Sequence, residues 1–128
     1  MARIAIDGDQ LLILMGTLES YQTRTRRYAV PLGNVTGVDT GRAPTAFVGS
    51  YSSGAGFGFG VEFKATSFIP FGGRYSTKEG RLLVAFRDPE KCITVSLKDE
   101  QYEKVIVQVE DKVQTADQIR SAISKPGA

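Results

Sequence analysis

The most concentrated charge in this chain is a group of three arginines, Arg24, Arg26 and Arg27. A guanidinium presents a planar fork of N–H donors that matches phosphate and carboxylate, so three of them on one loop would form an anion-binding site. In the other interpretation they belong to a solvated loop and strand edge, where Arg27 and Arg24 pair with acids such as Glu19 and discourage strand-to-strand aggregation. The three arginines are therefore a candidate anion site with both interpretations open.

A second candidate surface lies in the glycine-rich segment 41–60, which we expect to be a long connection. Tyr51, Phe57 and Phe59 stand there among small residues. The segment fits no phosphate-binding motif, because no Gly-Lys-Ser/Thr follows and the third glycine of a dinucleotide fingerprint is replaced by Phe59. Aromatic side chains supply much of the energy of protein interfaces, which makes these three residues candidate partner-binding residues. For Phe59 we favour a place in the core.

The other reactive groups fit structural roles better than catalysis. The chain contains no histidine, so a Ser-His-acid or Cys-His arrangement has no base, and the most common zinc ligand is missing. Asp7 and Asp9 flank a turn glycine, which is ordinary turn chemistry. Cys92 is the single cysteine and lies in an apolar stretch, where we expect a small buried side chain. We therefore predict no catalytic residue, no metal site, no cofactor and no enzyme activity.

Length and composition indicate one domain over residues 1–128, long enough to bury a core without disulfides or metals. The formal net charge of +2 is too small for a nucleic-acid footprint, so we expect no nucleic-acid partner. No apolar stretch has the length of a membrane span, and a membrane surface is a secondary partner hypothesis. With one cysteine and no export signal, we expect a cytoplasmic protein.

Short stretches with alternating apolar and polar residues recur between positions 3 and 109 and predict an antiparallel β fold. The Asp7-Gly8 pair between two such stretches predicts a tight hairpin, and Pro31 fits the end of an edge strand. We expect turns at 32–35 and at 70–73. The strand residues expected to point inward are bulky and favour a filled interior: Ile13, Val30, Val38, Phe63, Val84, Phe86, Val95, Leu97 and Ile106.

A helix is predicted at the end of the chain, over about 112–124. Asp111 is a suitable N-cap, with Gln114 three residues later. Apolar residues then recur at helical spacing and predict one buried stripe, formed by Val113, Ala116, Ile119 and Ile123.

Two segments resemble the bacterial pleckstrin-homology-like (PH-like) domains. Residues 28–38, YAVPLGNVTGV, are similar to the apolar-Pro-Leu segment that precedes a strand in that family, and residues 105–111, VIVQVED, are similar to its approach to the closing helix. Gly33 and Asn34 stand where the family usually has small hydroxyl residues. The resemblance implies a strongly bent antiparallel sheet or partly open barrel of about seven strands, capped by the C-terminal helix.

The resemblance also implies a non-catalytic binding or assembly module. A protein partner or self-association is the expected activity, because an incompletely closed sheet leaves strand edges that pair between subunits. The alternative is a carrier of a small apolar or anionic ligand, held in the barrel or by the Arg24–Arg27 loop.

Overall fold

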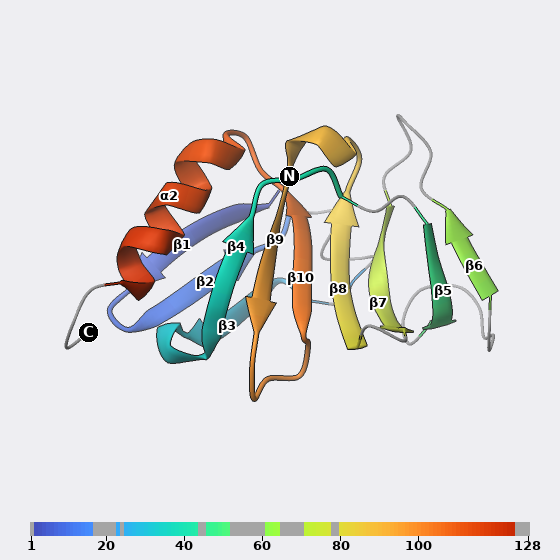
Figure 1. The fold of residues 1–128 in the computed structure, drawn as a ribbon, viewed down its shortest axis with the longest axis horizontal. Helices are drawn as coiled ribbons and strands as arrows, with labels where there is room; N and C mark the ends of the chain where they lie inside the picture. Colours follow the sequence, from blue (N-terminus) through green and yellow to red (C-terminus); the bar gives the residue numbers. More distant parts are fainter. Residues whose placement is uncertain are drawn as a thin grey trace.

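The computed structural model describes residues 2–16, 23, 25–43, 46–51, 61–64, 71–77 and 80–124, with the backbone alone described for 46–51, 61–64, 71 and 72. Strands dominate the described residues, and one long helix closes the chain (Figure 1). In order the elements are β1 (Arg3–Asp7), β2 (Gln10–Leu14), β3 (Arg27–Pro31), the 3-10 helix η1 (Leu32–Asn34), β4 (Val35–Asp39), β5 (Ala46–Tyr51), β6 (Val61–Lys64), β7 (Phe71–Thr77), β8 (Gly80–Phe86), the 3-10 helix η2 (Pro89–Lys91), β9 (Cys92–Leu97), β10 (Lys104–Gln108) and α2 (Lys112–Ile123).

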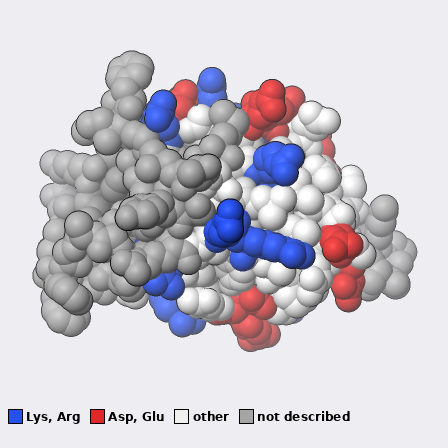
Figure 2. All heavy atoms as spheres, turned by 180° about the vertical axis from the view of Figure 1, so that it is seen from behind, with Lys and Arg blue, Asp and Glu red and all other residues white. Residues whose placement is uncertain are grey.

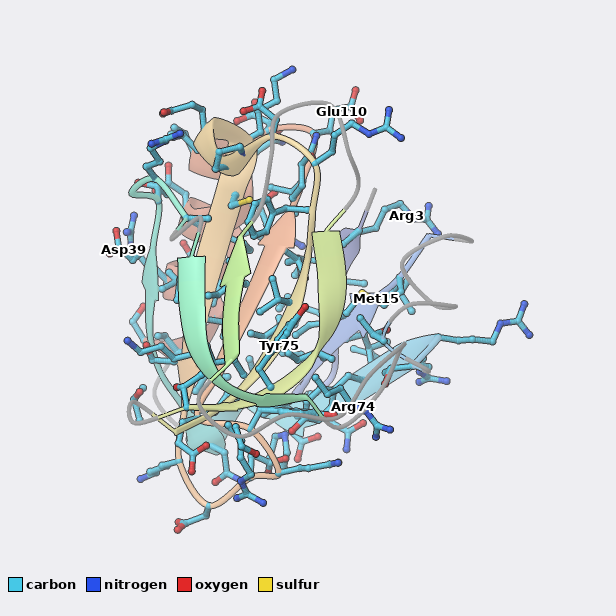
Figure 3. The ribbon with its side chains drawn as sticks, turned by 90° about the vertical axis from the view of Figure 1, so that its right-hand side faces the viewer. Arg3, Met15, Asp39, Arg74, Tyr75 and Glu110 are labelled. Atoms are coloured by element: carbon cyan, nitrogen blue, oxygen red, sulfur yellow. The ribbon has the colours of Figure 1, made fainter. Side chains whose placement is uncertain are left out.

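The predicted class, mainly β with a C-terminal helix, is confirmed. The described residues hold ten strands, in a three-stranded sheet with the order β1-β2-β3 and a seven-stranded sheet with the order β4-β9-β10-β8-β7-β5-β6. The sheets are not closed into a barrel, and the larger one is bent (Figure 3). All pairs are antiparallel except β8 with β10.

The parallel pair arises because the connection from β8 to β9 passes the end of β10, which lies between them. The side-chain oxygen of Gln108 at that end accepts hydrogen bonds from the backbone N–H groups of Arg87 and Asp88, at 2.8 and 2.9 Å. The Asp88 carboxylate in turn caps η2 by accepting from the N–H of Glu90. Side chains therefore satisfy the backbone groups of this crossover.

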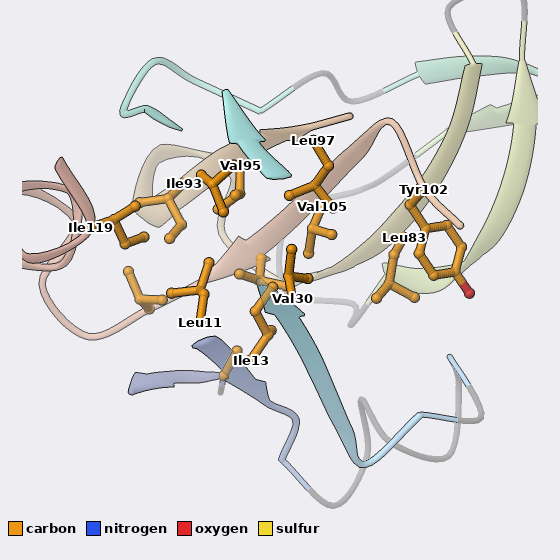
Figure 4. Packing of buried hydrophobic residues seen from close by; sticks show 14 of the residues in the cluster. Leu11, Ile13, Val30, Leu83, Ile93, Val95, Leu97, Tyr102, Val105 and Ile119 are labelled. Atoms are coloured by element: carbon orange, nitrogen blue, oxygen red, sulfur yellow. The ribbon is translucent and has the colours of Figure 1, made fainter. Parts of the chain in front are cut away.

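The two sheets enclose one apolar interior, shown in Figure 4. Side chains from the inner face of the three-stranded sheet meet side chains from β8, β9, β10 and α2. Burial of this apolar surface is the main force that holds the sheets together. The buried members include Leu11, Ile13, Val30, Leu83, Ile93, Val95, Val105, Val107 and Ile119, each fully buried.

The opposite face of the seven-stranded sheet carries a second buried cluster. It takes Leu82, Val84 and Phe86 from β8, while Leu83 and Ala85 of the same strand face the first cluster. Every expected inward-pointing residue with a described side chain is buried or partly buried, but they divide between the two faces. Ile13, Val30, Val38, Val95 and Leu97 belong to the first cluster, and Val84, Phe86 and Ile106 belong to the second; the side chain of Phe63 lies outside the described residues.

The terminal helix begins where the sequence predicts. The Asp111 carboxylate accepts a hydrogen bond from the backbone N–H of Gln114 at 3.0 Å, as expected for an N-cap. Ala116 and Ile119 of the predicted stripe are buried, and Ala122 joins them. Val113 is 59% exposed, so its assignment to the stripe was wrong. It lies in the first turn of the helix.

Two predicted connections are strands. Residues 46–51, expected within a long loop, form β5, which pairs with β6 and β7. Residues 71–73, expected to turn the chain, begin β7, where Gly72 and Gly73 lie opposite Ala85 and Val84. Glycine favours turns through its backbone freedom, but in both places pairing with a neighbouring strand outweighs that preference.

Candidate binding face and edge of the three-stranded sheet

The outer face of the three-stranded sheet is built from alternate residues of β1, β2 and β3. Register places three rows across it: Arg3, Leu14 and Arg27; then Ala5, Leu12 and Ala29; then Asp7, Gln10 and Pro31. The face is therefore basic at one end, apolar in the middle, where Leu12 is buried, and acidic on β1 at the other end. Figure 2 shows this side of the molecule, with basic side chains near the centre beside uncharged surface and acidic ones towards the right.

Arg3 lies in the same row of the sheet as Arg27, one of the three arginines of the candidate anion site. Arg3 and Arg27 flank Leu14 on neighbouring strands, and both side chains are exposed. Arg3 points away from the larger sheet in Figure 3. Arg26 is also exposed, and its carbonyl accepts a hydrogen bond from the N–H of Met15. Within the described residues, Arg3, Arg26 and Arg27 form no ion pair and no side-chain hydrogen bond, so their guanidinium groups face solvent.

The other candidate residues are only partly covered by the structure. Arg24, Phe57 and Phe59 lie outside the described residues. The backbone of Tyr51 is the last residue of β5 and lies opposite Tyr75 of β7. The structure thus joins Arg26 and Arg27 to Arg3, and it leaves the grouping of the three aromatic residues a prediction.

The free edge of β1 is defined by the hairpin that joins β1 to β2. Gly8 has a φ of +61°, and Asp7 pairs with Gln10 across the turn, as the Asp-Gly signal predicts. Because the closing pair of such a hairpin is hydrogen-bonded and the pairs alternate, Arg3, Ala5 and Asp7 direct their backbone groups to β2. Ile4 and Ile6 therefore direct theirs to the free edge.

Two neighbouring hydrogen bonds support this alternation. The N–H of Met15 donates to the carbonyl of Arg26, so odd-numbered residues of β2 bond to β3 and even-numbered ones bond to β1. The N–H of Ala2 donates away from β2, to the carbonyl of Gln108 at 3.1 Å. The outward backbone groups of Ile4 and Ile6 form no hydrogen bond with any of the described residues.

Features that block strand addition occur on the edges of β3 and β4. On β4, the Arg120 guanidinium of α2 donates to the carbonyl of Val38 at 3.1 Å, and the register of β4 shifts between Val35 and Gly37. On β3, Pro31 lacks an N–H group and Arg27 is exposed. Proline, irregular register and a covering helix are the usual means of blocking strand addition. β1 has neither a proline nor a register shift, and α2 contacts it.

A groove of about 640 Å³ runs beside this edge. Ala2, Arg3 and Ile4 line one side, and the first turns of α2 line the other through Gln114, Thr115 and Gln118. Val109, Glu110 and Asp111 close the end where β10 leads into the helix. The helix thus leaves open space along the first half of the β1 edge.

A group of polar side chains that the sequence analysis missed ties the two sheets together. Glu100 accepts hydrogen bonds from the Tyr28 hydroxyl at 3.2 Å and from the side-chain amide of Asn34 at 2.6 Å. The Tyr28 ring packs edge-on against Tyr102 at 5.4 Å. Burial, followed by the charge of Glu100 and its hydrogen bond, raises the pKa of Tyr28 to about 12. This group is a structural link, because the two carboxylate oxygens of Glu100 are already bonded to Tyr28 and Asn34.

Cys92 is fully buried in the second cluster, as expected for a small apolar residue. Burial, together with the charge of Asp88, raises the pKa of its thiol from 9.0 to about 12. Thiolate is the reactive form of cysteine, so this thiol is unreactive in the folded protein at neutral pH.

Alkaline pH is expected to destabilise the protein through Cys92. In the unfolded chain the thiol loses its proton above about pH 9, whereas in the folded protein it keeps the proton up to about pH 12. The unfolded state therefore binds fewer protons in this window, and the free energy of unfolding falls as pH rises through it. Urea unfolding at neutral pH and at steps above pH 9 should show a shallower fall for Cys92→Ala. Equal slopes for the two proteins would contradict the assignment.

The sequence contained a signal for Arg3 that the cluster at 24–27 obscured. Arg3 occupies an outward position of a strand whose partner register is fixed by the Asp7-Gly8 turn, but its distance to Arg27 also depends on β3 pairing with β2.

No group of three potential metal ligands occurs within the described part of the chain, and none of its helices has the length and apolar character to cross a bilayer. Comparison with family models, curated proteins and solved structures finds no match.

Proposed function

We propose that this chain is a non-catalytic, PH-like binding and assembly module that acts in the cytoplasm and associates with a second copy of itself. The observation that carries the proposal is the edge of β1, which has no proline and no register shift and where Ile4 and Ile6 direct backbone donors and acceptors away from β2. Unpaired strand edges bind other strands, and evolved proteins block the edges that must stay single. Among the edges of β1, β3 and β4, that of β1 has neither the proline of β3 nor the register shift of β4, which supports a role for it.

The resemblance to PH-like domains agrees with the bent sheet and the C-terminal helix. The interior also favours a surface function. The space between the sheets is filled by fully buried side chains such as Ile13, Val30 and Val105, which leaves binding to the faces and edges. A carrier with its ligand between the sheets would need that space open.

A second candidate function is the binding of a small anion on the outer face. Arg3 and Arg27 on one row, with Arg26 adjacent, favour it, because exposed guanidinium groups on a rigid sheet match phosphate or carboxylate.

Native mass spectrometry of the untagged protein, combined with sedimentation over a wide concentration range, tests the proposal. We expect a homodimer that dissociates on dilution, because an interface built mainly on one strand pair is small. A protein that stays monomeric throughout would overturn self-association. A monomer that carries a reproducible extra mass would instead identify the ligand carrier.

A further inference from the structure

We infer that the dimer forms by antiparallel pairing of β1 with β1 of a second copy, about a two-fold axis that passes Ala5. This inference rests on the proposed self-association and names its interface. In the pairing, Ile4 lies opposite Ile6 of the other copy, and Arg3 lies opposite Asp7 of the other copy. The two three-stranded sheets become one continuous six-stranded sheet with isologous contacts, which is the symmetry of most homodimers.

Backbone hydrogen bonding permits this register. Ile4 and Ile6 are the residues of β1 whose N–H and C=O groups point to the free edge, and the two-fold axis at Ala5 places them opposite each other. Each such pair exchanges two hydrogen bonds, so the dimer gains four. Ala5 then faces its own symmetry mate in a non-hydrogen-bonded pair. A pairing shifted by an odd number of residues would place residues whose backbone groups point to the free edge opposite residues whose backbone groups point to β2. It would form none of these hydrogen bonds.

The charges of β1 select this register among those that keep the hydrogen bonds. The strand reads Arg-Ile-Ala-Ile-Asp, with opposite charges at its two ends and both charged side chains exposed. Neither Arg3 nor Asp7 forms an ion pair with another described residue. Antiparallel pairing at Ala5 places Arg3 and Asp7 side by side twice, and opposite charges directly across a strand pair are stabilising. A shift by two residues in either direction loses both charge pairs.

The side chains on the two faces also match. Arg3, Ala5 and Asp7 share the outer face, so the charge pairs form in solvent-accessible positions and flank the small Ala5 pair. Ile4 and Ile6 lie on the inner face, are only partly buried, and pack against the first cluster. Pairing them across the axis covers their remaining apolar surface. The groove lined by Ala2, Arg3 and Ile4 provides space beside the first half of the edge.

Charge reversal with mixing tests the inference. Arg3→Asp alone puts two acids opposite each other at both ends of the pairing, and Asp7→Arg alone puts two arginines there. We expect each single variant to weaken self-association by at least about tenfold, since like charges directly opposite are destabilising. An equimolar mixture of the two variants should form a heterodimer, because both opposite-charge pairs are then restored. The double variant Arg3→Asp/Asp7→Arg should self-associate as the parent does.

Arg27→Asp on β3 and Asp9→Arg in the β1–β2 turn are the matched controls, since they reverse exposed charges of the same sheet that do not enter the pairing. Circular dichroism of each variant reports folding, and heterodimer formation on mixing shows that both single variants are folded and competent to bind. If the parent is a dimer and the single variants associate as tightly as it does, the interface lies elsewhere and the inference fails while the proposed function stands. A monomeric parent would remove the proposed function itself.

Discussion

Replacing Val105 with alanine is expected to lower the free energy of unfolding by about 2 kcal/mol. Val105 lies on β10, between β8 and β9 in the larger sheet, and its side chain is fully buried against the inner face of the smaller sheet. Two methyl groups are lost from a close-packed interior that has contacts on every side, so a cavity is added to the loss of buried area.

Val113→Ala is the matched control for this prediction, because it makes the same chemical change at an exposed position of α2. We expect a change of less than about 0.5 kcal/mol there, since the side chain is in solvent and alanine is the better helix former. Urea unfolding followed by circular dichroism measures both variants. Equal effects at the two positions would contradict the arrangement in which the inner face of β10 is buried against the smaller sheet.

The parts of the fold that the sequence predicted are those decided by local chemistry. The Asp7-Gly8 turn needs a positive φ that glycine accepts, and the start of α2 needs the Asp111 side chain as a cap. Both are fixed within a few residues of the chain, and both are confirmed. The alternating strands were found for the same reason, since burial on one face imposes a period of two.

The parts that were missed depend on pairing between distant residues. Nothing local to β8 indicates that β10 lies beside it in a parallel pair, because that arrangement follows from the crossover to β9. Alternation predicted that Val84 and Val95 are buried, but it does not say that they face opposite sides of one sheet. The strand β5 was missed because its glycine-rich surroundings resemble a loop and its partner strands are provided by tertiary structure.

The residues of the candidate site also fall into those that the local sequence identifies and those that depend on pairing between distant strands. Arg26 and Arg27 were found because they are adjacent in the sequence, whereas Arg3 joins them only through the register of β1, β2 and β3. The open edge of β1 is a property of sheet order. A sequence reveals which strands pair with their neighbours through tight turns, but whether an edge stays uncovered depends on where α2 packs.

Covalent capture of the dimer gives the second large effect. In the proposed pairing Ala5 meets its symmetry mate in a non-hydrogen-bonded antiparallel pair, where Cα atoms are separated by about 4.5 Å. Disulfides span Cα separations of about 4.4–6.8 Å, so a cysteine at this position is within bonding range of its own copy. The native Cys92 does not interfere, because it is fully buried and its raised pKa keeps it protonated.

The most direct measurement is mild oxidation of the Ala5→Cys variant, with covalent dimer read by non-reducing electrophoresis. Ala29→Cys is the control, since Ala29 shares the outer face and the same row but lies on β3, away from the pairing edge. The proposed interface predicts nearly complete disulfide dimer for Ala5→Cys, reversed by reductant, and little for Ala29→Cys or the parent. Equal cross-linking at both positions, or none at Ala5→Cys in a protein that is still dimeric, would contradict pairing through β1.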